Sequence, residues 1–129
     1  MGKILINDPD SWLLRKLYAA DKSDVETYRV FKCLRRYFSD TRDFIGIIEV
    51  INPTIMRFKP LTDLADDCLF SVSVFPESIE HKHNYRGAPT LDFYSNTGKH
   101  AFSQTGYNCI AKHWSFWTKF INTKVVKHK

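Results

Sequence analysis

The chain has 129 residues, of which 43% are hydrophobic and 26% are charged, and its net charge is +5. These values are typical of one folded domain and exclude an intrinsically disordered chain, which would hold fewer hydrophobic residues. No apolar run reaches the length of a membrane span or of a signal-peptide core, so we expect a cytoplasmic protein without membrane contact. The excess of basic residues favours an acidic partner, either a nucleic acid or an acidic protein surface.

The three cysteines, Cys33, Cys68 and Cys109, are far apart in the sequence. An odd number of cysteines without a close pair fits neither a disulfide framework nor a zinc site. Each lies among apolar residues, which predicts buried free thiols. The glycines are scattered and form no phosphate-binding loop. We therefore expect neither a metal nor a small-molecule cofactor.

Two helices are predicted in the N-terminal third of the chain. Pro9 marks the start of the first, in which Leu13 and Leu17 recur at helical spacing. Ser23 and Glu26 have the spacing of a capping box, in which each side chain accepts a hydrogen bond from the other residue's backbone amide. The second helix follows directly, so the pair is expected to form a short antiparallel hairpin. Its predicted apolar stripe comprises Tyr28, Phe31, Leu34 and Phe38.

Three segments are compatible with both helix and strand. Apolar residues recur at helical spacing in residues 44–55 and, after Thr62, in residues 64–72. The first segment is also rich in β-branched residues, and residues 70–74 alternate as a strand does. Thr90 can cap a helix over residues 91–103, although the turn-forming Ser95–Gly98 also fits the turn of a hairpin. We favour a helix in each segment.

Two more helices are predicted towards the C-terminus. Pro76 suits the first turn of a short helix that ends at His83. The last helix spans Asn108 to Asn122, and its apolar side includes Trp114 and Trp117. Residues 124–129 form a basic tail that is expected to be frayed.

These elements predict a mainly α fold, a compact single-domain helical bundle of about five to seven short helices over residues 1–129. The alternative is an α+β fold with a small antiparallel sheet from residues 44–51, 69–75 and 91–103.

Aromatic residues make up 15% of the chain and are more numerous near the C-terminus than one helix face needs. Aromatic and arginine side chains dominate the energetic centres of protein interfaces. The predicted protein-binding residues are those that core packing does not account for, namely Tyr85, Arg86, Tyr107 and Phe116.

A basic strip on the second helix is the candidate nucleic-acid interface. Its members, at helical spacing, are Arg29, Lys32, Arg35 and Arg36. Such a strip can follow a phosphate backbone while a neighbouring tyrosine stacks on a base. The competing interpretation is a solvated face that is balanced by acidic residues such as Asp24 and Glu26.

Four histidines supply the residue type that metal-independent cleavage of RNA needs, namely His81, His83, His100 and His113. His113 also lies on the apolar side of the last helix, where a hydrogen-bonded core histidine is favoured. Asp66 and Asp67 are expected to be exposed carboxylates rather than a matched acid–base pair. No catalytic motif is present, which favours a protein that is not an enzyme.

The favoured function is that of a bacterial or phage inhibitor or a toxin-neutralising immunity protein, which acts by stoichiometric association with another protein, such as one with an acidic surface. The first alternative is a nucleic-acid-binding protein that uses the basic helix. The second is a histidine-dependent ribonuclease.

Overall fold

The computed structural model describes residues 9–38, 60–87 and 89–126, and every regular element in these ranges is helical. The elements are α1 (Pro9–Tyr18), α2 (Asp24–Phe38), α5 (Leu61–Val74), α6 (Pro76–Arg86), α7 (Leu91–Gln104), α8 (Asn108–Lys112), α9 (Trp114–Phe120) and the π-helical η3 (Ile121–Val126). The predicted mainly α fold is confirmed. The sheet alternative is wrong for residues 69–75 and 91–103, which α5 and α7 contain almost entirely, while residues 44–51 lie outside the described ranges.

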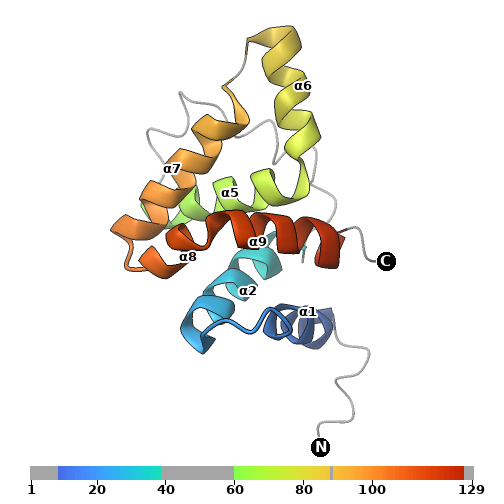
Figure 1. The fold of residues 1–129 in the computed structure, drawn as a ribbon, viewed down its shortest axis with the longest axis vertical. Helices are drawn as coiled ribbons and strands as arrows, with labels where there is room; N and C mark the ends of the chain where they lie inside the picture. The colour runs from blue at the N-terminus through green and yellow to red at the C-terminus, as the bar shows by residue number, and fades with distance from the viewer. Residues whose placement is uncertain (1–8, 39–59, 88, 127–129) are drawn as a thin grey trace, which may run out of the picture.

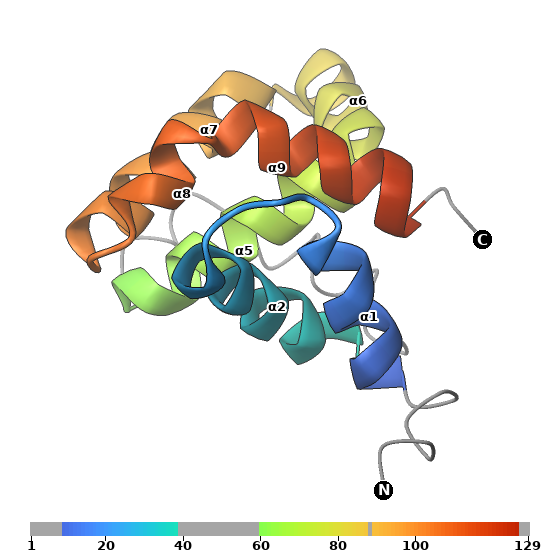
Figure 2. The same cartoon turned by 60° about the horizontal axis from the view of Figure 1, so that its bottom comes forward.

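α5 lies at the centre of the described part of the molecule, with α2, α7 and α9 packed around it (Figures 1 and 2). Its residues Leu64–Ser73 are all buried, so this helix is covered on every side. Leu69 and Phe70 are fully buried members of the hydrophobic core. A helix that is buried on every side is normally apolar all round, yet α5 also buries Asp66 and Asp67.

α1 and α2 pack against each other across a short turn, and α1 contributes Leu13 and Leu17 to the core. One half of the predicted capping box is confirmed, because Ser23 Oγ accepts a hydrogen bond from the Glu26 backbone N–H at 3.2 Å. The Glu26 side chain does not stay at the helix terminus but is buried. The predicted apolar stripe of α2 is wrong at Tyr28, whose side chain is 52% exposed.

α7 begins as predicted at Thr90, whose Oγ1 accepts a hydrogen bond from the Phe93 backbone N–H at 3.1 Å. The helix continues through Gly98, where the sequence also allowed a hairpin turn. A Cβ atom at Gly98 would lie 2.9 Å from the Cys68 Cβ and would overlap the Trp114 ring. The glycine is therefore required because α5 and Trp114 approach the α7 backbone closely.

The C-terminal helix is divided in a way that the sequence did not predict. α8 and α9 are separated by a turn at His113, and η3 follows α9. The predicted core face is confirmed, because Trp114, Trp117 and Ile121 are buried. In the segment that was expected to be frayed, Val125 is buried within η3, and residues 127–129 lie outside the described ranges.

Candidate functional site

α6 projects from the rest of the described structure along its long axis (Figure 1). Pro76 occupies the first turn, as predicted, and the left-handed Gly87 (φ 68°) ends the helix, its N–H donating to the His83 carbonyl at 3.1 Å. Among the α6 side chains that the structure describes, only Ile79 is buried. α6 therefore contributes little apolar burial, and most of its described side chains are polar.

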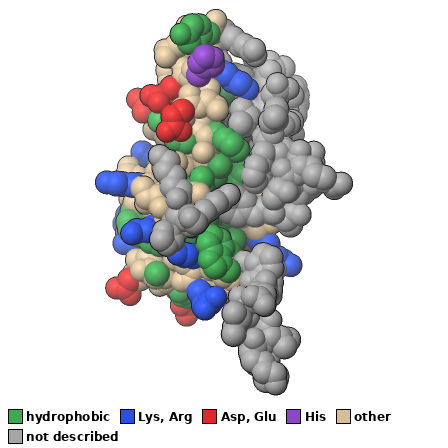
Figure 3. Space-filling model, turned by 90° about the vertical axis from the view of Figure 1, so that its right-hand side faces the viewer, with side chains coloured by type: hydrophobic (Ala, Val, Ile, Leu, Met, Phe, Trp, Pro, Cys, Tyr) green, Lys and Arg blue, Asp and Glu red, His purple; other side chains and the backbone are tan. Residues whose placement is uncertain are grey.

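The outer end of α6 carries an exposed aromatic residue among basic ones. Tyr85 is 76% exposed, and its ring centroid lies 4.5 Å from that of His81, one helical turn earlier. Figure 3 shows histidine, cationic and hydrophobic side chains at this end of the molecule, with acidic side chains further down. Residues 81–87 include no acidic residue, whereas Glu77 and Glu80 lie nearer the base of the helix.

The four predicted protein-binding residues do not form one surface. Tyr85 lies on α6, shortly before α7 begins, and Tyr107 follows the end of α7. The 14 residues of α7 span about 20 Å. Tyr107 is partly buried, with the Arg29 guanidinium 5.3 Å from its ring centroid. Phe116 is 37% exposed, and the Lys22 ammonium lies 4.4 Å from its ring centroid. Arg86 is the last residue of α6, and its side chain lies outside the described part of the structure.

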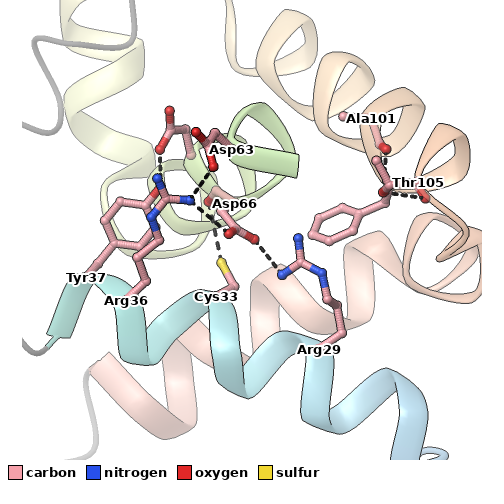
Figure 4. A network of polar contacts seen from close by, with 10 residues as sticks. Arg29, Cys33, Arg36, Tyr37, Asp63, Asp66, Ala101 and Thr105 are labelled. Atoms are coloured by element: carbon pink, nitrogen blue, oxygen red, sulfur yellow. Dashed lines mark hydrogen bonds and ion pairs between the residues drawn. The ribbon is translucent and has the colours of Figure 1, made fainter. Parts of the chain in front are cut away.

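The basic strip of α2 faces α5 along one edge (Figure 4). Arg29 is buried and donates to Asp66 Oδ1 at 2.6 Å. Arg36 bonds to Asp63 Oδ1 at 2.9 Å and to Asp66 Oδ2 at 3.2 Å. The predicted position of Asp66 at the surface is wrong, because these two guanidinium groups compensate its burial.

The other two members of the strip, Lys32 and Arg35, are exposed. The Lys32 ammonium lies 6.0 Å from the ring centroid of Tyr28 on the same helix. The predicted phosphate-following strip is thus divided in two. Arg29 and Arg36 pair with carboxylates of α5, although only Arg29 is buried, and Lys32 and Arg35 are exposed.

A buried polar cluster continues from this ion pair along α2 and α5. The Tyr37 hydroxyl donates to Asp67 Oδ1, and the Cys33 thiol donates to the Asp66 carbonyl at 3.4 Å. Asp67, like Asp66, is buried, contrary to the expectation that it would be exposed. Burial raises the pKa of the Tyr37 hydroxyl and that of the Cys33 thiol, and nearby carboxylates act in the same direction. Both groups therefore stay protonated in the folded protein at neutral pH.

Glu26 connects α2 to the C-terminal helices. Its Oε2 accepts a hydrogen bond from Trp117 Nε1 at 2.6 Å, and His113 Nδ1 lies 2.8 Å from the same oxygen. When this carboxylate is ionised, His113 donates through Nδ1, so a neutral ring carries its lone pair on Nε2. The His113 side chain is 42% exposed, less buried than predicted for a core histidine. The sequence holds one indication that Glu26 points into the core, because Glu26 shares a helix face with Val30, Cys33 and Tyr37.

The four histidines lie in three different parts of the described structure. His81 and His83 are exposed on α6, His100 is exposed on α7, and His113 lies between α8 and α9. Within the described ranges, no three His, Cys, Asp or Glu residues are grouped so that they could hold a metal ion.

Comparison with known proteins adds no relative to this description. No protein-family model, curated protein or solved structure matches the chain. In the part of the chain that the structure covers, no helix combines the length and the apolar character that crossing a bilayer requires.

Proposed function

We propose that the protein acts by stoichiometric association with another protein, whose contact surface is acidic, and that the outer end of α6 is the principal contact. The observation that carries this proposal is the position of Tyr85, 76% exposed at the end of a projecting helix. Tyrosine is among the residues that contribute most to protein interfaces, because its ring buries a large area at a low cost in side-chain entropy.

The character of α6 supports this assignment. A surface helix normally buries a continuous apolar stripe, whereas α6 buries Ile79 alone among its described side chains. The helix thus adds little to the hydrophobic core, and Tyr85 near its outer end is exposed to solvent. Lys82 lies one helical turn before Tyr85, and its positive charge attracts carboxylates, which gives the acidic character of the proposed partner.

The two alternative functions have less support. Arg29 and Arg36 are engaged by acidic residues of α5, which leaves fewer cations for a phosphate backbone. His113 contacts Glu26, and His100 lies on a different helix from His81 and His83, which share α6. General acid–base cleavage requires two such groups close to one substrate. An inhibitor or immunity protein, which acts by binding alone, agrees best with these features.

The experiment is affinity capture from extracts of the native host with the wild-type protein, Tyr85→Ala and Tyr18→Ala, each with and without nuclease treatment. Tyr18 is a matched control because it is 41% exposed on α1, away from α6. We expect one protein to be captured at a one-to-one ratio by the wild type and by Tyr18→Ala, and to be lost with Tyr85→Ala. Loss of the captured protein on nuclease treatment would instead support the nucleic-acid alternative.

A further inference from the structure

The outer face of α2, which we define as Asp24, Val25, Tyr28 and Lys32, is a second exposed surface with apolar residues. Val25 is 66% exposed and Tyr28 is 52% exposed, and the two charged residues are also exposed. Val25, Tyr28 and Lys32 follow one another at intervals of three and four residues, so they share one side of the helix. This side is opposite to the buried side that contacts α5.

Two of the charges on this side of α2, Asp24 and Lys32, are placed symmetrically about Tyr28, and the exposed Arg35 lies further along the same side. Asp24 precedes Tyr28 by four residues, and Lys32 follows it by four residues. If two copies of α2 pack antiparallel with a two-fold axis at Tyr28, Asp24 of each copy lies level with Lys32 of the other. Each ion pair would lie about 6 Å along the helix from the axis, because the rise is about 1.5 Å per residue.

We propose that the occupant of this face is a second copy of the chain, bound antiparallel through α2 in a two-fold symmetric dimer. The two Tyr28 rings meet at the axis, and the aliphatic part of Lys32 covers Val25 of the other copy. The two Asp24–Lys32 pairs favour the antiparallel arrangement, because a parallel arrangement would place like charges side by side. The interface is self-complementary and closes, so association stops at two copies.

The proposed dimer is weak. One helix face per copy buries less surface than a standard interface, and two chains of net charge +5 repel each other. At physiological ionic strength this repulsion is screened beyond about 8 Å, whereas the contact pairs are closer than that. We expect a dissociation constant on the order of 100 µM.

Dimerisation through α2 leaves α6 free. α6 lies at the end of the long axis away from α1 and α2 (Figure 1). A dimer would therefore present two copies of the outer end of α6. Two copies raise the avidity for a partner that carries its acidic surface two or more times. The proposed dimer stands independently of the function proposed for α6, since its test needs only the purified chain.

The test is sedimentation equilibrium of the wild-type chain, Asp24→Lys, Lys32→Glu and an equimolar mixture of the two variants. Each variant alone places like charges opposite each other twice in the dimer, and we expect its association to weaken about tenfold. In the mixture, Lys at position 24 faces Glu at position 32, and the second pair is the native one. The mixture is therefore expected to associate as strongly as the wild type.

Lys112→Glu is the control, because it makes the same charge change on an exposed residue of α8 and should not alter association. Restoration in the mixture also shows that both variants are folded, and circular dichroism of each variant checks this separately. A wild-type chain that stays monomeric up to millimolar concentration would overturn the proposal. So would a mixture that associates no better than the separate variants.

Discussion

Gly98 of α7 lies directly against the indole ring of Trp114, which comes from α9. A Cβ atom on this residue would overlap the ring atoms of Trp114 and lie 2.9 Å from the Cβ of Cys68 on α5. One residue without a side chain therefore sets the distance at which three helices meet.

The first prediction concerns this contact. Gly98→Ala should lower the free energy of unfolding by about 1–3 kcal/mol, because overpacking outweighs the gain of about 1 kcal/mol in helix propensity. Urea unfolding followed by circular dichroism measures this change. Asn96→Ala, at an exposed position of the same helix, is the control and should be neutral or slightly stabilising.

A double variant separates overpacking from other effects. In a Trp114→Phe background the atoms that Gly98→Ala would overlap are absent, so the added cost of the alanine should be smaller. An equal cost in both backgrounds would contradict the account of this contact.

A second prediction concerns the buried pair between Arg29 and Asp66. Asp66→Ala should cost about 3–5 kcal/mol, because it leaves the Arg29 guanidinium buried without its acceptor. Asp63→Ala, on the same helix, should cost less than about 1 kcal/mol, since its partner Arg36 is largely exposed. Chemical denaturation of both variants tests this contrast. Similar losses in the free energy of unfolding would show that the Arg29–Asp66 pair is no more buried in solution than the Arg36–Asp63 pair.

The long-range partners of the polar residues explain why the sequence predicted the helices better than the site. Helix starts at Pro9, Ser23 and Thr90 could be predicted because the determining residues are neighbours in the chain. Glu26, by contrast, meets residues 87 and 91 positions away. Asp66 likewise meets an arginine 37 positions earlier. Such pairing depends on how the helices pack, and local spacing does not encode it.

The predicted binding residues illustrate the same limit. Tyr85 was selected because no core periodicity included it, and it is indeed exposed. Tyr107 and Phe116 were selected on the same ground, but cations from α2 and from the turn before it lie over their rings. The exposure of a single residue such as Tyr85 can thus be predicted from the sequence. Whether several such residues form one surface depends on how the helices are arranged, which local spacing does not give.

A third prediction concerns Glu26. Glu26→Gln keeps the shape of the side chain but removes the charge that accepts hydrogen bonds from His113 and Trp117. We expect a loss of about 1–3 kcal/mol in the free energy of unfolding. The tryptophan emission maximum of the chain, to which Trp117 contributes, should also shift relative to wild type. Glu77→Gln, at an exposed position of α6, is the control and should leave both the stability and the emission unchanged.

A fourth prediction concerns alkaline pH. The pKa values of Tyr37 and Cys33 are raised in the folded state, mainly by burial, so the folded protein keeps protons that the unfolded chain loses. Their contribution to stability is fully present below the unfolded pKa values, about 8.5 for Cys and about 10 for Tyr, and falls as the pH rises above them. Each group adds a slope of up to about 1.4 kcal/mol per pH unit.

Urea unfolding at a series of pH values from about 8 to 11 measures this slope. Tyr37→Phe should reduce the slope above about pH 10, whereas Tyr18→Phe, at a 41% exposed position, should not. An unchanged slope in Tyr37→Phe would mean that the hydroxyl does not stay protonated in the folded state.

The central claim is that Tyr85 at the outer end of α6 is the principal contact with an acidic protein partner. Its most direct measurement is the dissociation constant between the purified chain and the captured partner, determined by calorimetric titration for the wild type, Tyr85→Ala and Tyr18→Ala. We expect Tyr85→Ala to raise the dissociation constant by about 30-fold, the effect of losing a residue worth about 2 kcal/mol, and Tyr18→Ala to leave it unchanged. A Tyr85→Ala protein that binds its partner as tightly as the wild type would contradict the claim.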